Sequence, residues 1–205
     1  SVTEIWDYCF ENCSSLKEIS IPSSISSIDD YCFDHCSSLI NIIIPSSVKS
    51  IGEYCFNGCS SLETITIPSS VTSIGDYCFK ECLSLKTIKI PSSVVYFGDG
   101  AFSLCKSLKN VSLPSSLTSL DGTFNFCESL VEVVIPSSVT IIGDFAFDEC
   151  HSLKHIDIHS KVTRICKYAF RNCLSLAQIV IPSSVTAIEK YAFEGCSSLK
   201  EVMIS

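Results

Sequence analysis

Basic side chains are scarce in this sequence, and long apolar runs are missing. Lys and Arg number 14 against 22 Asp and Glu, which gives a formal net charge of −8 with His neutral. Binding to nucleic acid or to an anionic membrane depends on clustered positive charge, so the composition disfavours both partners. No stretch of about 18 or more apolar residues occurs, and the sequence therefore predicts no membrane-spanning helix.

A repeat of 23 residues runs through the chain. In each of nine units, Phe stands three residues before a repeating cysteine and Leu stands three residues after it. A fixed period of this length is typical of a solenoid, in which each coil buries its apolar side chains against neighbouring coils. One interval is 22 residues long, and there Gly122 takes the place of an aromatic residue, so we expect a kink or looser packing. The repeating cysteines are Cys13, Cys36, Cys59, Cys82, Cys105, Cys127, Cys150, Cys173 and Cys196.

Each unit carries one predicted strand and one predicted turn. The strand follows the Leu in the pattern L-x-x-I-x-I-P, where alternate aliphatic residues point inward and Pro ends the strand in seven units. The turn is the segment Y-C-F-x-x-C, whose apolar residues are three and four apart, as in one short helical or 3₁₀ turn. We therefore expect a right-handed solenoid of about nine 23-residue units, with one continuous parallel β-sheet on one face and short turns or 3₁₀ or helical segments on the other.

The combined pattern I-P-S-S-V-x-x-I-G-x-Y-A/C-F-x-x-C-x-S-L resembles the BspA-like leucine-rich repeats of bacterial and protist surface antigens. The similarity covers residues 1–205, which we expect to form a single leucine-rich repeat solenoid. Neither end has a visible polar capping unit, so we expect a segment of a longer array, in which end-to-end self-association is an option. The resemblance implies a cell-surface or secreted protein that binds a host or extracellular matrix protein without catalysis.

Two columns of cysteine invite a disulfide or zinc interpretation. Cys9, Cys32, Cys55 and Cys78 precede the repeating cysteine by four residues, but later units have Ala or Thr at this position, which favours simple packing of a small side chain. Neighbouring coils could bring the repeating cysteines within the Cα range of a disulfide. We favour reduced, buried thiols that donate weakly to backbone carbonyls. Such thiols suit a reducing cytosol, so an intracellular scaffold or regulatory subunit is the alternative function.

Catalytic and cofactor-binding motifs are not recognisable, so we predict no enzyme, no cofactor and no metal site. His151, His155 and His159 have a helical spacing, but their segment is predicted to be turn and strand. A column of seven carboxylates, ending in Lys167 and Lys190, predicts a solvated acidic edge, with calcium or a basic partner as the alternative. These carboxylates are Asp7, Asp30, Glu53, Asp76, Asp99, Asp121 and Asp144.

The outward positions of the predicted strands vary from unit to unit, while the inward positions do not. Such variation is what a recognition surface requires, although a neutral surface also allows it. Exposed aliphatic residues and a cluster of lysines on an acidic protein favour a binding face. The partner-binding candidates are Ile40, Ile43, Lys86, Lys89, Lys109, Val131, Val134 and His155. A structural array or filament is a third possible role.

Overall fold

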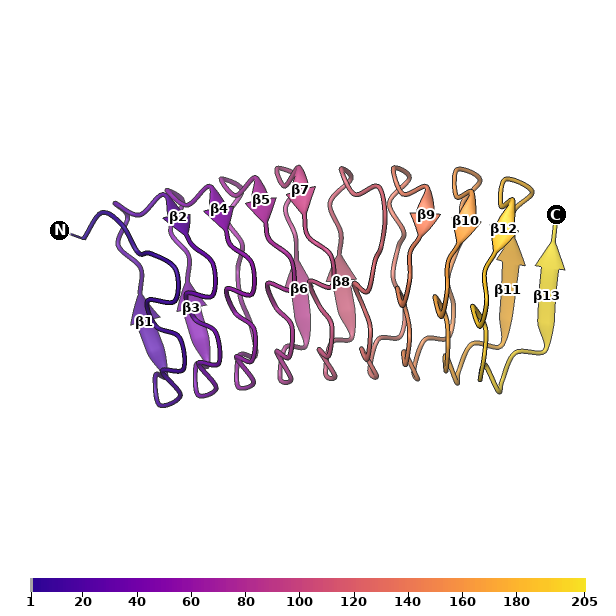
Figure 1. Ribbon diagram of the computed structural model, residues 1–205, viewed down its shortest axis with the longest axis horizontal. Helices are drawn as coiled ribbons and strands as arrows, with labels where there is room; N and C mark the ends of the chain where they lie inside the picture. The colour runs from indigo at the N-terminus through magenta and orange to yellow at the C-terminus, as the bar shows by residue number, and fades with distance from the viewer. Residues whose placement is uncertain (1) are drawn as a thin grey trace.

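The computed structural model describes residues 2–205 as an elongated stack of coils, with the two termini at opposite ends (Figure 1). Successive coils lie side by side along the long axis, as the 23-residue repeat predicts. Every regular element in the described residues is a short parallel strand. The described residues contain no helix that is long and apolar enough to span a bilayer. The predicted solenoid class is confirmed.

The predicted strand after each Leu forms a first ladder on one side of the coils. Its pairs join residues one coil apart in parallel register, such as Ile19 with Ile42 and Ile88 with Val111. Alternate residues point inward, as in β3, where Ile42 is buried between two exposed neighbours. The strands are β1 (Glu18–Ser20), β3 (Asn41–Ile43), β6 (Thr87–Lys89), β8 (Asn110–Ser112), β11 (Gln178–Ile181) and β13 (Glu201–Ile204).

This first ladder is not one continuous sheet, and that part of the expectation was wrong. It consists of the pairs β1–β3, β6–β8 and β11–β13, with a single bridge between Ile43 and Thr66. Between the first two pairs the backbone bonds lengthen, to 3.4 Å from Glu63 N to Ile40 O and 3.5 Å from Lys86 N to Glu63 O.

A second parallel ladder, which we did not predict as strands, lies on another side of each coil (Figure 1). It forms one sheet of four strands and one of three, and the coil between them is joined to the three-stranded sheet through a bridge from Ser119 to Ile141. That break falls at the 22-residue interval. The strands are β2 (Ser27–Ile28), β4 (Ser50–Ile51), β5 (Ser73–Ile74), β7 (Tyr96–Phe97), β9 (Ile141–Ile142), β10 (Arg164–Ile165) and β12 (Ala187–Ile188).

The segment Y-C-F-x-x-C forms hydrogen-bonded turns, with no helix or 3₁₀ element in the described residues. Alternate amides donate to carbonyls of the next coil: Tyr31 to Glu53 at 2.8 Å, Phe33 to Cys55 at 2.9 Å, and His35 to Asn57 at 2.7 Å. A helix would direct these N–H groups along its own axis, whereas here they join neighbouring coils. Two positions in each turn have positive φ, which allows the chain to reverse direction within a few residues.

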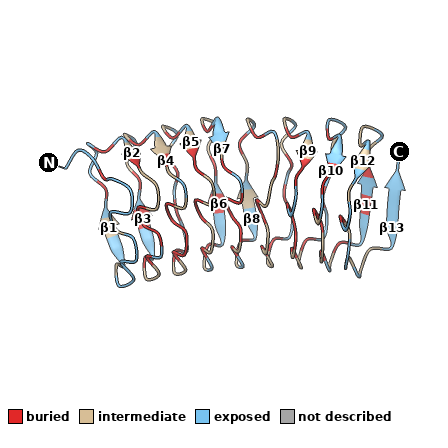
Figure 2. Cartoon of the chain, in the orientation of Figure 1, coloured by how far each residue is buried: buried red, intermediate tan, exposed pale blue. Residues whose placement is uncertain are grey.

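Buried residues occur in coil after coil along the solenoid (Figure 2), and a column of phenylalanine rings runs through this core. Rings of successive coils stack with centroids 5.2–5.9 Å apart. The longest spacing, 5.9 Å, separates Phe102 from Phe124 at the 22-residue interval. Both rings remain fully buried there, so the column of rings continues through the shorter interval.

Each repeating cysteine from Cys36 onward donates its S–H to the carbonyl of the Phe in the preceding coil. The Sγ–O distances of these eight bonds are 3.0–3.2 Å. All fourteen cysteines are free thiols. Burial raises the pKa of the Cys105 thiol to about 12, and burial together with nearby Cys13 raises that of Cys36 to about 11. These two buried thiols are therefore protonated donors at neutral pH.

Titration of the folded protein with a thiol reagent tests this arrangement. We expect rapid reaction at Cys9 and Cys13, the two exposed thiols, because the buried thiols are inaccessible and protonated. Denaturation without reductant should raise the count to 14, the full cysteine content. A count far below 14 in denaturant would reveal disulfides and contradict the reduced core.

Candidate functional site

The predicted partner-binding residues all lie on the outward side of the first ladder, which we call the strand face. The aliphatic candidates are exposed there, most of all Val134 at 84% and Ile43 at 72% of their surface. Ile40 and Val131 are exposed as well. Residues of the same column stand one coil apart, because the strands pair in parallel register with no stagger.

The strand face has two shallow hollows. One, of about 300 Å³, is lined by Ile43 with Glu18, Ser20 and Asn41. The second, of about 280 Å³, is lined by Val134 and His155, among other residues. The structure therefore brings Val134 and His155 of adjacent coils into one hollow and leaves Ile43 in a different one.

The three lysines of the strand face lie in the coils between these hollows. Lys109 and Lys86 are neighbours, since the Lys109 N–H donates to the Lys86 carbonyl at 2.9 Å. Lys86 Nζ also pairs with Glu63 Oε2 at 2.9 Å. This exposed pair neutralises part of the positive charge, so Lys89 and Lys109 carry most of the cationic character of the face.

The histidines of one unit face three different partners. His151 Nε2 lies 2.8 Å from Glu149 Oε2, and His155 Nε2 lies 3.0 Å from Asp157 Oδ1. His159 Nε2 lies 2.9 Å from the Pro136 carbonyl. The three imidazoles thus do not converge on one point where a metal ion could sit.

The acidic column has a structural role that its solvated position concealed. Asp30 Oδ1 accepts the N–H of Glu53 at 2.7 Å, and Asp76 Oδ1 accepts the N–H of Asp99 at 3.0 Å. A Cβ at Gly52 would collide with the Asp30 carboxylate, which explains the glycine that precedes the acidic residue in several coils. Each such carboxylate links two coils and keeps only part of its capacity for a cation.

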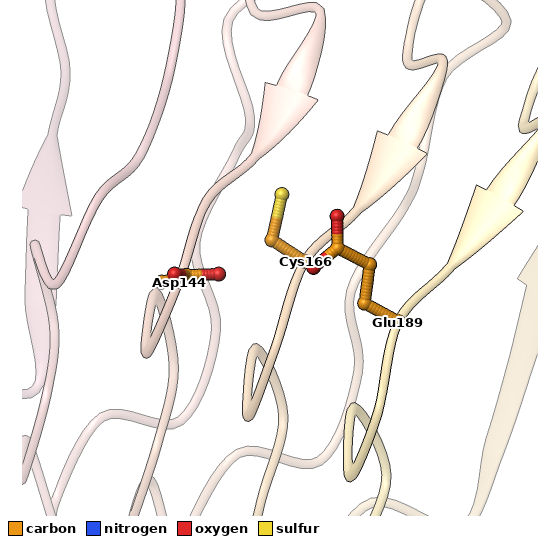
Figure 3. A group of neighbouring side chains, drawn as sticks. All are labelled: Asp144, Cys166 and Glu189. Carbon is orange, nitrogen blue, oxygen red and sulfur yellow. The ribbon is translucent and has the colours of Figure 1, made fainter.

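Asp144, Cys166 and Glu189 form the one group in residues 2–205 that could hold a metal ion through His, Cys or carboxylate ligands (Figure 3). Their ligand atoms lie within 4.8 Å of one another. Burial, with Glu189 and Asp144 nearby, raises the pKa of the Cys166 thiol to about 11. Asp144 Oδ1 already accepts the Lys167 N–H at 3.0 Å, and Glu189 Oε1 lies 3.8 Å from Arg164 Nη1. Sequence reasoning missed this group, although a cysteine in a column of glycines was a signal.

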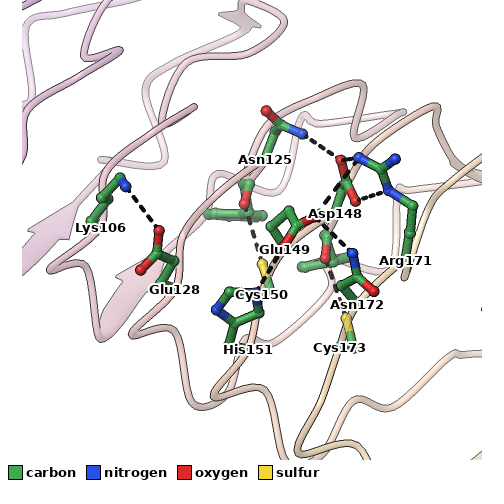
Figure 4. A network of polar contacts seen from close by, with 12 residues as sticks. Lys106, Asn125, Glu128, Asp148, Glu149, Cys150, His151, Arg171, Asn172 and Cys173 are labelled. Atoms are coloured by element: carbon green, nitrogen blue, oxygen red, sulfur yellow. Dashed lines mark hydrogen bonds and ion pairs between the residues drawn. The ribbon is translucent and has the colours of Figure 1, made fainter. Parts of the chain in front are cut away.

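A polar network crosses the turns of the later coils (Figure 4). Asp148 is buried, and the Arg171 guanidinium donates to its two carboxylate oxygens at 2.7 Å each. Asn125 Nδ2 adds a third bond to Asp148 at 3.0 Å. The guanidinium also lies over the Tyr168 ring, 5.0 Å from its centroid. Sequence reasoning missed this network, whose signal was the polar residue that follows the repeating Phe in every unit.

Glu149 belongs to the same network. Burial by itself would raise the pKa of this carboxyl, but hydrogen bonds from Asn172 and His151 outweigh it, so the pKa lies below its usual 4.5. Asn172 Nδ2 donates to Glu149 Oε1 at 2.7 Å. The coils on either side are thereby joined through side chains as well as through backbone.

Removal of one partner from the Asp148–Arg171 pair should destabilise the solenoid. Arg171→Met leaves a buried carboxylate without its cation, and we expect a loss of about 3–5 kcal/mol in the free energy of unfolding in urea. Asp148→Asn in the same chain should recover part of the loss, because it removes the unpaired charge. Lys86→Met, which breaks the exposed pair with Glu63, is the matched control and should cost less than about 1 kcal/mol. Equal losses in the two variants would contradict the importance of the buried pair.

Stacked coils of one length, an inward Leu in every coil and short parallel strands define a leucine-rich repeat solenoid. A family model described as "BspA type Leucine rich repeat region (6 copies)" matches residues 3–123 and 120–205. The chain belongs to this BspA-type leucine-rich repeat family, as the sequence pattern predicted. Proteins of such repeats are interaction modules and typically non-enzymatic. No curated protein matches the chain.

Solved structures of bacterial leucine-rich repeat proteins are similar to this chain. One from Bacteroides ovatus has 32% identity and a TM-score of 0.87, over 97% of this chain and 58% of its own. One from Eubacterium ventriosum has 28% identity and a TM-score of 0.74, over 91% and 60%. A leucine-rich cell surface protein from Faecalibacterium prausnitzii has 28% identity and a TM-score of 0.52, over 100% and 64%. The chain spans less than two thirds of each of these proteins, and its relatives include a bacterial cell-surface protein.

Proposed function

We propose that the solenoid is an adhesin-like recognition module of a surface antigen, which binds a host or extracellular matrix protein through the strand face. The observation that carries this proposal is the exposure of Ile43 and Val134 beside two hollows on the same face. Burial of one such aliphatic side chain against a partner stabilises a complex by about 1.5–3 kcal/mol. The lysines between the hollows add a charge that most of this acidic protein lacks.

In this proposal, residues 1–205 act as one domain. One hydrophobic cluster extends without interruption from Ile5 to Ala192, so the strand face rests on a single rigid support. Two hollows at fixed separation on such a support can select a partner by the spacing of its apolar side chains. A cell-surface or secreted setting is supported by the similarity to the Faecalibacterium prausnitzii cell surface protein.

Charge and polarity changes on the strand face test the binding proposal. The variant with Lys86, Lys89 and Lys109 changed to Glu, together with Ile43→Asp and Val134→Asp, should lose retention on decellularised extracellular matrix. The circular dichroism spectrum should not change, since these side chains are exposed. Changing Lys49, Lys161 and Lys190 to Glu repeats the three lysine changes near the second ladder and should leave retention intact. Normal retention of the strand-face variant would show that the face assignment is wrong.

An intracellular scaffold or regulatory subunit is the second candidate, and the fourteen free thiols favour it. Antibody staining of the source cells before and after permeabilisation separates the two settings. We expect staining of intact cells. Staining that requires permeabilisation would favour the intracellular function, and the partner should then be sought in cytosolic extract.

A further inference from the structure

A second column of aromatic rings runs along the outside of the turns and is interrupted in the middle. In the first four coils Tyr rings stack with centroids 4.8–5.0 Å apart. In the last three coils Phe145, Tyr168 and Tyr191 stack at 5.0–5.1 Å. The two coils between them have Gly100 and Gly122 at this position. All nine positions have φ between 50° and 63°, so the backbone that presents the rings continues through the gap.

The two glycines differ in what surrounds them. The Tyr77 ring leans over Gly100, where an added Cβ would collide with it. At Gly122 an added Cβ would meet only the Cα of Gly100, at 3.9 Å. A hollow of about 350 Å³ opens there, and its walls include Tyr77, Phe126 and Phe145. We call this hollow the aromatic gap.

The rings at the two ends of the aromatic gap each stack on one side. Tyr77 stacks on Tyr54, and Phe145 stacks on Tyr168. Their other faces are turned toward the missing rungs. Phe145 is 38% exposed, so this apolar surface meets solvent unless another group covers it.

The buried carboxylate on the polar wall of the aromatic gap already has its partners. The carboxylate oxygens of Asp148 accept three bonds from Arg171 and Asn125, and Ser103 Oγ donates to Asn125 Oδ1 at 3.5 Å. A cation would need a free carboxylate, and the Asp148 carboxylate is paired with Arg171. The gap offers instead flat apolar surface beside a neutralised ion pair, which suits an aromatic ring.

We propose that the aromatic gap binds an aromatic side chain of a protein partner, which takes the place of the rung missing at Gly122. The hollow is open at the surface, so an isolated ring would bury little area, and the flanking peptide must supply further contacts. Aromatic side chains are the usual anchors of protein interfaces. The site lies on the turns and is independent of the strand face.

The probe is the peptide acetyl-Gly-Gly-Trp-Gly-Gly-amide, with the Leu peptide of the same length as control. We expect the Trp peptide to shift the amide NMR signals of Gly122 and Phe145, and the Leu peptide to leave them unchanged. Gly122→Tyr should abolish the shifts while the melting temperature does not fall, because Tyr is the residue that this backbone conformation already carries in neighbouring coils. Thr87→Tyr adds the same ring on the strand face and should bind normally.

Phe145→Ala tests the site without filling it. Loss of one ring wall should weaken binding of the Trp peptide about two- to tenfold, and the exposed position should preserve the fold. Equal shifts with the Trp and Leu peptides, or undiminished binding by folded Gly122→Tyr, would overturn the proposal. Shifts with methyl glucoside but not with the Trp peptide would overturn it in favour of a carbohydrate. Equal binding of N-acetyltryptophanamide and the Trp peptide would overturn the assignment to a protein partner.

Discussion

Contact between neighbouring coils is the constraint on which the rest of this structure depends. A single coil of 23 residues cannot enclose its own apolar side chains, so each Phe ring packs against the rings before and after it. The S–H···O bond from each repeating cysteine to the previous Phe carbonyl ties the same two coils together. Backbone bonds of both ladders, and those of alternate amides in the turns, join neighbouring coils along the solenoid axis. Stability is therefore built from nearest-neighbour contacts.

Every column of the repeat faces the same neighbours in every coil. The packing therefore restricts the residue type at most positions and leaves the residue type at others free. The acidic column shows the first case, since Asp30 links two coils through the space that Gly52 leaves. The strand face shows the second, where Ile43, Lys89 and Val134 have little to contact within the chain. The binding sites that we propose are then local departures from a regular background. The strand face and the aromatic gap are two such departures on different sides of the coils.

Departures from the repeat were visible in the sequence, but their consequences were not. Gly122 was recognised as an irregular position, yet the opening beside it depends on where the Tyr77 ring leans and on the conformation of the turn. Cys166 stands outside the two columns of cysteine, and only the stacking of three coils brings it near Asp144 and Glu189. The Asp148–Arg171 pair joins residues 23 positions apart that share one column. Two-residue strands such as β2 are too short for any periodicity to reveal.

The sequence by itself determined the solenoid, the inward columns, the first ladder and the family. The same residue pattern occurs in nine units, so the assignment of each column does not depend on any single segment. It also predicted that the repeating cysteines are reduced thiols that donate to carbonyls, because a disulfide needs paired Cβ directions and a uniform ladder does not offer them. Tertiary structure alone decided the turns in place of a helix, the division of the sheet and the hollows of the surface. These depend on hydrogen bonds and side-chain positions between coils, and such contacts join residues that are far apart in the chain.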